Sequence, residues 1–256
     1  MAFSIQKANF WKRFSAWLVD TFLVILLAVA FCFPTLKVFH YESYGEQLIA
    51  IQDIYRPQFE EEYNTDLTIS EETYNELSDA DKKRYEDGMA AFEQALFSNE
   101  EYVTLRAERA TAIFATVTIS LFLGVLLAHF FLPLCLQNGQ TLGKKTFGTA
   151  VIRTNGVKIT PMQLFVRSIV GLFTIETAAL AFLLMVYPVG TIAGGILLVL
   201  QIAVMIKTPT NSSIHDLLTD TAVVDFSSQQ IFATEQDRLN YLAKEAEDAA
   251  NATSTY

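Results

Sequence analysis

The feature that most constrains this chain is a long apolar run near its start, Phe10–Phe33, with basic residues at its N-terminal end. From Phe14 to Phe33 the only charged residue is Asp20. About 20 apolar residues in a helix are enough to cross the hydrocarbon core of a bilayer. A charge inside such a helix costs about 2.5–3.5 kcal/mol, so it usually faces a partner or a water-filled cavity. The rest of the chain should therefore supply polar groups for Asp20.

Three further apolar segments follow, at about 111–136, 168–187 and 191–206. The 256-residue chain is 52% hydrophobic although 18 basic and 28 acidic residues are present, which suits apolar spans alternating with charged loops. We therefore expect an all-α membrane protein with four transmembrane helices, an extracytoplasmic helical insert and a small cytoplasmic β-hairpin. The expected parts are 1–36 (lead and first span), 37–110 (acidic insert), 111–226 (the remaining spans and the β element) and 227–256 (acidic cytoplasmic tail).

The insert 37–110 is strongly acidic and has helical periodicity. It carries 18 acidic and 7 basic residues. Ser70 and Ser78 each precede acidic residues, as at helix N-termini. An apolar stripe recurs at helical spacing in the order Tyr74, Leu77, Tyr85, Met89, Phe92 and Leu96. Two interpretations stay open: a helical hairpin that covers its own apolar stripe, or a docking surface for another protein.

The loop after the second span has the pattern of a small β element. Residues 149–160 are two β-type runs joined by Asn155-Gly156, a strong two-residue hairpin signal. The segment 221–226 reads as another strand that can pair with 149–154.

Basic residues set the expected orientation. The loop 137–167 carries five basic residues and no acidic one, and the N-terminal lead is also basic. Positive residues favour the cytoplasmic side, so both termini should be cytoplasmic and the protein should lie in the cell (plasma or inner) membrane. Cys32 and Cys135 then fall in opposite leaflets, which makes a disulfide implausible. The net charge of −10, with no recognisable motif, argues against nucleic-acid binding.

Four polar residues fall at similar depth in the four expected spans: Asp20, His129, Glu176 and Gln201. At about 1.5 Å per residue each lies roughly 8–14 Å inside the membrane from the cytoplasmic end. One interpretation is a hydrogen-bonded cluster that holds the helices together, at about 0.6 kcal/mol per contact. The other is an ion or proton site, because intramembrane carboxylates and histidines often mark such paths. His129 is also compatible with ordinary packing.

The segment Gly139–Lys144 invites comparison with a phosphate-binding loop. It has three residues between its glycines, one too few, and a membrane span precedes it instead of a strand. We therefore expect no nucleotide site here. Lys144 and Lys145 should instead lie at the lipid headgroups.

Several separated segments together resemble one family. They are RFSAWLVD (13–20), NGQTLGKKTFGTAVIRTNG (138–156), Arg167 and IHDLLTDTAVV (214–224), and in this order they resemble the RDD family of small integral membrane proteins. The resemblance covers 10–34 and 111–226 but not the insert, which is longer than the loop usual in that family. The family is named for an arginine and two aspartates, which here look like Arg13, Asp20 and Asp216. Some members are linked to sodium/proton exchange.

Arg13, Asp20, Arg167 and Asp216 are therefore expected to form a charge cluster at the cytoplasmic mouth, with Arg167 paired to Asp20 or Asp216. The leading functional hypothesis is cation or proton-coupled transport, with Na+ or H+ moving through an oligomeric helix bundle in the lipid bilayer. The alternative is a non-transporting scaffold or partner subunit that docks another membrane protein through the insert or tail. No catalytic triad and no metal-binding cluster are recognisable in the sequence, so no enzyme, cofactor or metal site is expected.

Overall fold

The computed structural model describes residues 4–179 and 188–254. It is mostly helical and divides into two compact units: unit 1 comprises 1–31 with 120–256, and unit 2 comprises 32–119. Among the described residues, three helical segments are long and apolar enough to cross a membrane: Phe10–Val38, Glu100–Cys135 and Val189–Lys207. They correspond to the first, second and fourth expected spans.

The third expected span, 168–187, is described only in its first part. After the short helix α8 (Pro161–Phe165), the chain continues as a π-helix, η3 (Val166–Ala178), and residues 180–187 lie outside the described part of the chain. The hydroxyls of Thr174 and Thr177 each donate to a carbonyl five residues earlier, at 2.9 and 2.8 Å. The π-helical hydrogen-bond spacing is rare, and single turns of it often occur at functional sites. The four-span topology itself remains a prediction.

Unit 2 contains the acidic insert and has its own hydrophobic core. The helices are α2 (Tyr41–Tyr63), α3 (Glu71–Glu76) and α4 (Asp79–Ser98), together with the C-terminal end of α1 (Phe10–Val38) and most of α5 (Glu100–Val125). Ser70 and Ser78 are N-caps whose hydroxyls accept from Thr73 N–H and Asp81 N–H, as expected. The core is formed by Leu48, Ile51, Leu67, Phe92, Leu96, Tyr102 and Leu105, with Tyr85 and Met89 packed against it. Most of the predicted apolar stripe is therefore covered within the insert.

The continuation of α5 in unit 1 also departs from a regular α-helix. It passes into a π-helical turn, η1 (Leu126–Phe131), and ends with α6 (Leu132–Cys135) and a 3-10 turn, η2 (Gln137–Gly139). The short helix α7 (Leu142–Thr146) follows. Within unit 1, Val24 of α1 packs against Val125 and Ala128.

A two-stranded antiparallel sheet joins two distant segments of unit 1. Strand β1 (Thr149–Arg153) pairs with β2 (Thr221–Asp225), in a register that sets Val151 opposite Val223. This pairing confirms the predicted contact of 149–154 with 221–226. The second arm of the predicted hairpin differs, because it makes a single bridge from Lys158 to Ile152 while Lys158 N–H donates to the Phe232 carbonyl at 3.0 Å. The N-terminal lead pairs with β2 instead, through Asp225 N–H to Gln6 (3.0 Å) and Ala8 N–H to Val223 (3.3 Å).

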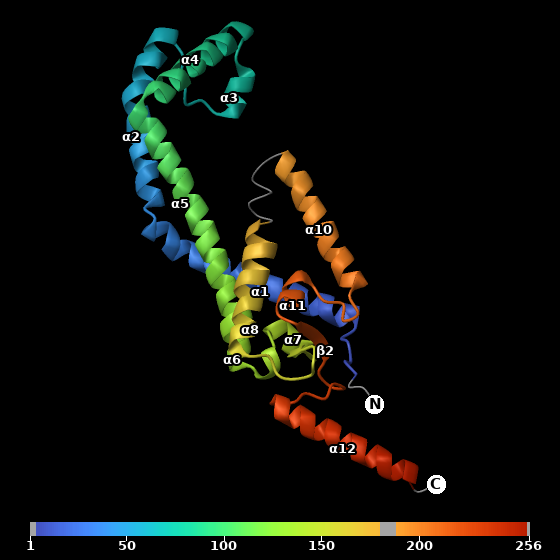
Figure 1. The fold of residues 1–256 in the computed structure, drawn as a ribbon. Coiled ribbons are helices and arrows are strands. Elements are labelled where there is room, and N and C mark those ends of the chain that lie inside the picture. The colour runs from blue at the N-terminus through green and yellow to red at the C-terminus, as the bar shows by residue number, and fades with distance from the viewer. Residues whose placement is uncertain (1–3, 180–187, 255–256) are drawn as a thin grey trace. The chain divides into compact units, whose positions relative to one another are not determined.

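Three helices lie in the described residues from 188 onwards. They are α10 (Val189–Lys207), α11 (Ile214–Leu218), and α12 (Glu235–Ser254) in the acidic tail. Helix α11 packs against η3 and lies beside β2 (Figure 1). This packing places the short segment 213–221 at the centre of the polar groups described next.

Candidate functional site

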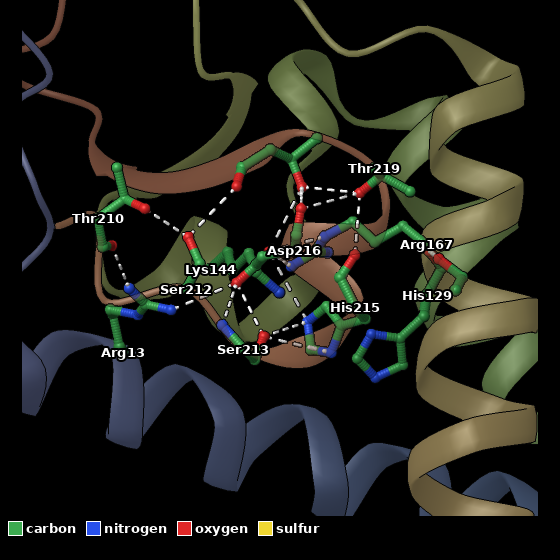
Figure 2. A network of polar contacts seen from close by, with 12 residues as sticks. Arg13, His129, Lys144, Arg167, Thr210, Ser212, Ser213, His215, Asp216 and Thr219 are labelled. Atoms are coloured by element: carbon green, nitrogen blue, oxygen red, sulfur yellow. Dashed lines mark hydrogen bonds and ion pairs between the residues drawn. The ribbon is translucent and has the colours of Figure 1, made fainter. Parts of the chain in front are cut away.

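A fully buried carboxylate, Asp216, joins three segments of unit 1. Arg167, in the first turn of η3, donates to Asp216 Oδ1 through Nε at 3.1 Å and Nη2 at 2.7 Å. Arg13, in the first turn of α1, reaches Oδ2 at 3.5 Å and donates to the Thr210 carbonyl at 3.2 Å. Asp216 is 0% exposed and Arg167 is 4% exposed. We call Arg13, Arg167 and Asp216 the Asp216 cluster (Figure 2).

The local sequence holds Asp216 in place. Ser213 is the N-cap of α11 and Asp216 occupies its third position, so the two side chains form a capping box. Asp216 Oδ2 accepts from Ser213 N–H at 3.1 Å and from the Ser213 hydroxyl at 2.8 Å. Burial by itself would raise the pKa of Asp216, but Arg167, His215 and Arg13 outweigh it and hold that pKa well below its usual value. Asp216 is thus an anion with hydrogen-bond donors on both oxygens.

The second carboxylate, Asp20, contacts the N-terminus of α7. Its partners are the Thr141 hydroxyl and the Gly143 N–H, the latter at 2.8 Å from Oδ1. Thr141 is also the N-cap of α7, where its hydroxyl accepts from Lys144 N–H. Gly143 is needed for this approach, because a Cβ there would lie 2.2 Å from the Ala16 carbonyl oxygen. The segment 140–145 therefore forms a turn that binds a carboxylate of this same chain.

One cationic group lies near Asp20. Lys144 Nζ is 3.7 Å from Asp20 Oδ2, longer than the 2.7–2.9 Å of a close charge-assisted hydrogen bond. Burial lowers the pKa of Lys144 to about 8, although Asp20 raises it. We call Asp20 and Lys144 the Asp20 pair. The lipid-headgroup prediction therefore differs from the structure for Lys144, whose ammonium turns inward because the buried carboxylate attracts it, while Lys145 is exposed.

A third carboxylate, Glu176, lies between two other elements. Glu176 Oε1 accepts from His215 N–H at 3.0 Å and lies 2.7 Å from His215 Nδ1. Glu176 Oε2 accepts from Gln201 Nε2 of α10 at 2.7 Å. The side chains of Glu176 and His215 are 8% and 16% exposed. We call these three residues the Glu176 site.

The four residues expected in one polar layer are thus distributed over separate contacts. Glu176 and Gln201 meet, but the described side chains show no hydrogen bond or ion pair between Asp20 and either of them. His129 accepts a hydrogen bond from the Ser168 hydroxyl (2.6 Å) through its backbone carbonyl. Its imidazole lies beside that of His215 (Figure 2), and the two interact electrostatically.

The charge cluster expected from Arg13, Asp20, Arg167 and Asp216 is likewise divided. Arg13 and Arg167 both bind Asp216, whereas Asp20 has Lys144 as its partner. His215, Ser213, Thr141 and Gly143 were not among the predicted site residues. The Ser-x-x-Asp pattern at 213–216 and the threonine before Leu142 are N-cap signals that point to these contacts.

This chain resembles known proteins at the level of a family. A sequence model described as the RDD family matches residues 7–220, most of the chain. No curated protein and no solved structure matches.

Proposed function

This chain belongs to the RDD family, and from that premise we propose that it is a membrane transporter that exchanges a monovalent cation, Na+ in the first instance, for protons. The observation that carries this proposal is the Asp20 pair. Asp20 lies in an apolar, span-length helix and is 2% exposed. An ionisable group in such a place is costly and commonly functional.

The balance of charge in the Asp20 pair supports exchange. With Lys144 protonated, the ammonium compensates the carboxylate from 3.7 Å. The pKa of Lys144 is lowered by burial to about 8, so the amine loses its proton as the pH rises through about 8, and a cation that binds Asp20 favours this loss at lower pH. Asp20 then keeps its two hydrogen-bond donors but lacks a counter-charge within 4 Å among the described residues. A monovalent cation that binds the carboxylate restores neutrality, so cation binding and proton release are coupled one to one.

Other parts of the proposal follow from the sequence. Four spans enclose little space, so we expect the transporter to be an oligomer. We place it in the cell (plasma or inner) membrane, with both termini and the basic loop 137–167 in the cytoplasm. Lys145, which is exposed, is then available to lipid headgroups. The reaction we propose changes no covalent bond other than N–H bonds, so the protein is not an enzyme in this account.

The test is proton flux in vesicles that contain the purified full chain and an entrapped pH-sensitive dye. A pulse of external NaCl should make the interior alkaline for the unmodified protein. Asp20→Asn and Lys144→Gln should each reduce this flux at least tenfold. Lys145→Gln, which changes an exposed neighbour in the same helix, should leave it unchanged. Full flux in folded Asp20→Asn protein would remove the proposal.

A second candidate function rests on unit 2. Because the insert has its own core and still exposes Ile49 and Ile54 on α2, at 56% and 74%, it has the properties of a docking module. The chain would then be a non-transporting scaffold or partner subunit. Deleting 40–105 should abolish co-purification of a partner while leaving unit 1 in the membrane. An unchanged partner profile after the deletion would count against this function.

A further inference from the structure

A groove lies where the span-length helix Glu100–Cys135 ends and α8 begins. Its walls come from α6, the turn η2 and the segment that leads from Lys158 into α8 (Figure 1). It has a volume of about 200 Å³, and Leu134, Leu136 and Ile159 are among the apolar side chains that line it. A groove at the end of a membrane-spanning helix lies at the level of the lipid headgroups.

The walls of the groove are held by two tight local contacts. Gly139 has a left-handed backbone, with φ at 61°, and a Cβ there would lie 2.9 Å from Ile159 Cγ2. On the other wall, Thr160 and Gln163 form a capping box at the start of α8. The hydroxyl and the N–H of Thr160 are thereby both used by Gln163. The shape of the groove is therefore fixed by the chain itself, as in most ligand pockets.

Two polar side chains in the groove have no partner within the part of the chain that the structure describes. They are the exposed ammonium group of Lys158 and the side-chain amide of Asn138. The loop 137–167, to which both belong, carries five basic residues and no acidic one. An ammonium group has only donors, and an amide adds two more. The groove therefore offers positive charge and hydrogen-bond donors to an anion.

The rim of the groove is apolar and open. Leu134, which lines the groove, is 44% exposed. Met162 and Phe165, which follow the lining residues Pro161 and Leu164 on the second wall, are 69% and 39% exposed. Exposed apolar surface of this kind marks contact with a membrane or with another molecule. A free phosphate ion leaves this surface uncovered, whereas the acyl chains of a phospholipid cover it.

We propose that this groove binds one anionic phospholipid. The lipid phosphate lies at Lys158 and Asn138, and the glycerol and the first part of the acyl chains lie along Leu134, Leu136 and Ile159. No covalent bond changes. The site uses neither Asp20 nor Lys144, so it does not depend on the proposed cation exchange.

The test is lipid binding to the purified full chain, counted by native mass spectrometry in detergent during titration with dioleoyl phosphatidylglycerol. Lys158→Gln should weaken the first bound lipid about fivefold, because one lysine near anionic lipid contributes about that factor. Lys158→Arg, which keeps the positive charge, should bind like the unmodified protein. Lys244→Gln makes the same charge change at an exposed lysine of α12 and should have no effect.

Two competing ligands separate a phospholipid from its parts. Dioleoyl phosphatidylcholine should bind more weakly than phosphatidylglycerol, because its choline cation cancels the phosphate charge. Inorganic phosphate in large excess should not displace phosphatidylglycerol. Equal affinity for the two lipids would overturn the proposal, as would displacement by inorganic phosphate, which would indicate a site for the free ion.

A second variant tests the other polar group of the groove. Asn138→Asp keeps the size of the side chain and tolerates the left-handed backbone at this position, where φ is 61°. It replaces a donor with a negative charge, so it should weaken phosphatidylglycerol binding at least as much as Lys158→Gln. Unchanged binding in both variants, or an equal loss in Lys244→Gln, would overturn the proposal. If sodium-driven flux is absent but lipid binding depends on Lys158, the proposed function fails and the lipid site stands.

Discussion

Asp216 and Asp20 are both almost fully buried, yet their surroundings differ in kind. Asp216 has two guanidinium groups, one of them donating twice, and the capping contacts of Ser213. Asp20 has a hydroxyl, a backbone N–H and one ammonium at 3.7 Å. Arginine stays charged in proteins, whereas a buried lysine can lose its proton. The comparison separates an ion pair whose cations stay charged from one whose cation can lose its proton, and the proposed exchange depends on this second property.

The largest expected effect comes from removing the ion pair of Asp216. Asp216→Ala leaves Arg167 and Arg13 buried without their anion, and breaking a buried pair costs about 3–5 kcal/mol. We expect loss of most folded protein in detergent, measured by size-exclusion chromatography and thermal unfolding. A variant with unchanged unfolding would show that Asp216 has no structural role.

Protonation of Asp216 by acid should destabilise the protein less than Asp216→Ala, because it removes the negative charge but keeps the side chain in place. The pKa of Asp216 is lower in the folded state than its ordinary value of about 4. Its contribution to stability is therefore present above pH 4 and is lost as the pH falls below 4 towards the folded pKa. Unfolding temperatures between pH 2 and pH 6 should show this loss, and it should be absent from Asp216→Asn.

The packing around Asp20 can be tested without touching a charge. Gly143→Ala sets a Cβ against the Ala16 carbonyl oxygen, and α7 must move away from α1. Overpacking of this kind costs about 1–3 kcal/mol. Gly195→Ala in α10 meets no atom within 4 Å and is the matched control. Equal unfolding temperatures for the two variants would contradict the close packing of α7 on α1.

The two arginines should differ from each other. Arg167→Lys loses one of two hydrogen bonds to Asp216 and should cost about 1–2 kcal/mol. Arg13→Lys alters a longer contact of 3.5 Å and should cost less than Arg167→Lys. Chemical unfolding of both variants measures the order, and a larger effect for Arg13 would reverse our ranking.

Sequence patterns indicate the span-length helices, two N-caps of the insert and the pairing of the two strands, but not the π-helical segments η1 and η3. The length of the apolar runs indicates the three span-length helices of the described residues. Serine followed by acidic residues indicates the N-caps of α3 and α4. The β-type runs indicate β1 and β2. The RDD resemblance is confirmed over residues 7–220.

The contacts of the polar residues were harder to predict for a physical reason. Counting residues gives depth along a helix but not rotation about its axis, and the π-helical spacing of η3 changes which residues share a face. Asp20 and Glu176 therefore have similar expected depth but different partners. Asp20 is bound by Gly143 N–H, and no side-chain pattern indicates a backbone donor. The sequence left two partners open for Arg167, Asp20 and Asp216, because both are carboxylates and charge alone does not distinguish them.

The most direct test of the exchange at Asp20 is proton release when a cation is added to the purified protein in weakly buffered detergent solution near pH 7, where Lys144, with its pKa of about 8, still carries its proton in most chains. Our account predicts that NaCl releases close to one proton per chain at saturation, with no release from Asp20→Asn or Lys144→Gln and full release from Lys145→Gln. Choline chloride at equal ionic strength should release none. An unmodified protein that releases no proton, or a Lys144→Gln variant that releases as many, would contradict it.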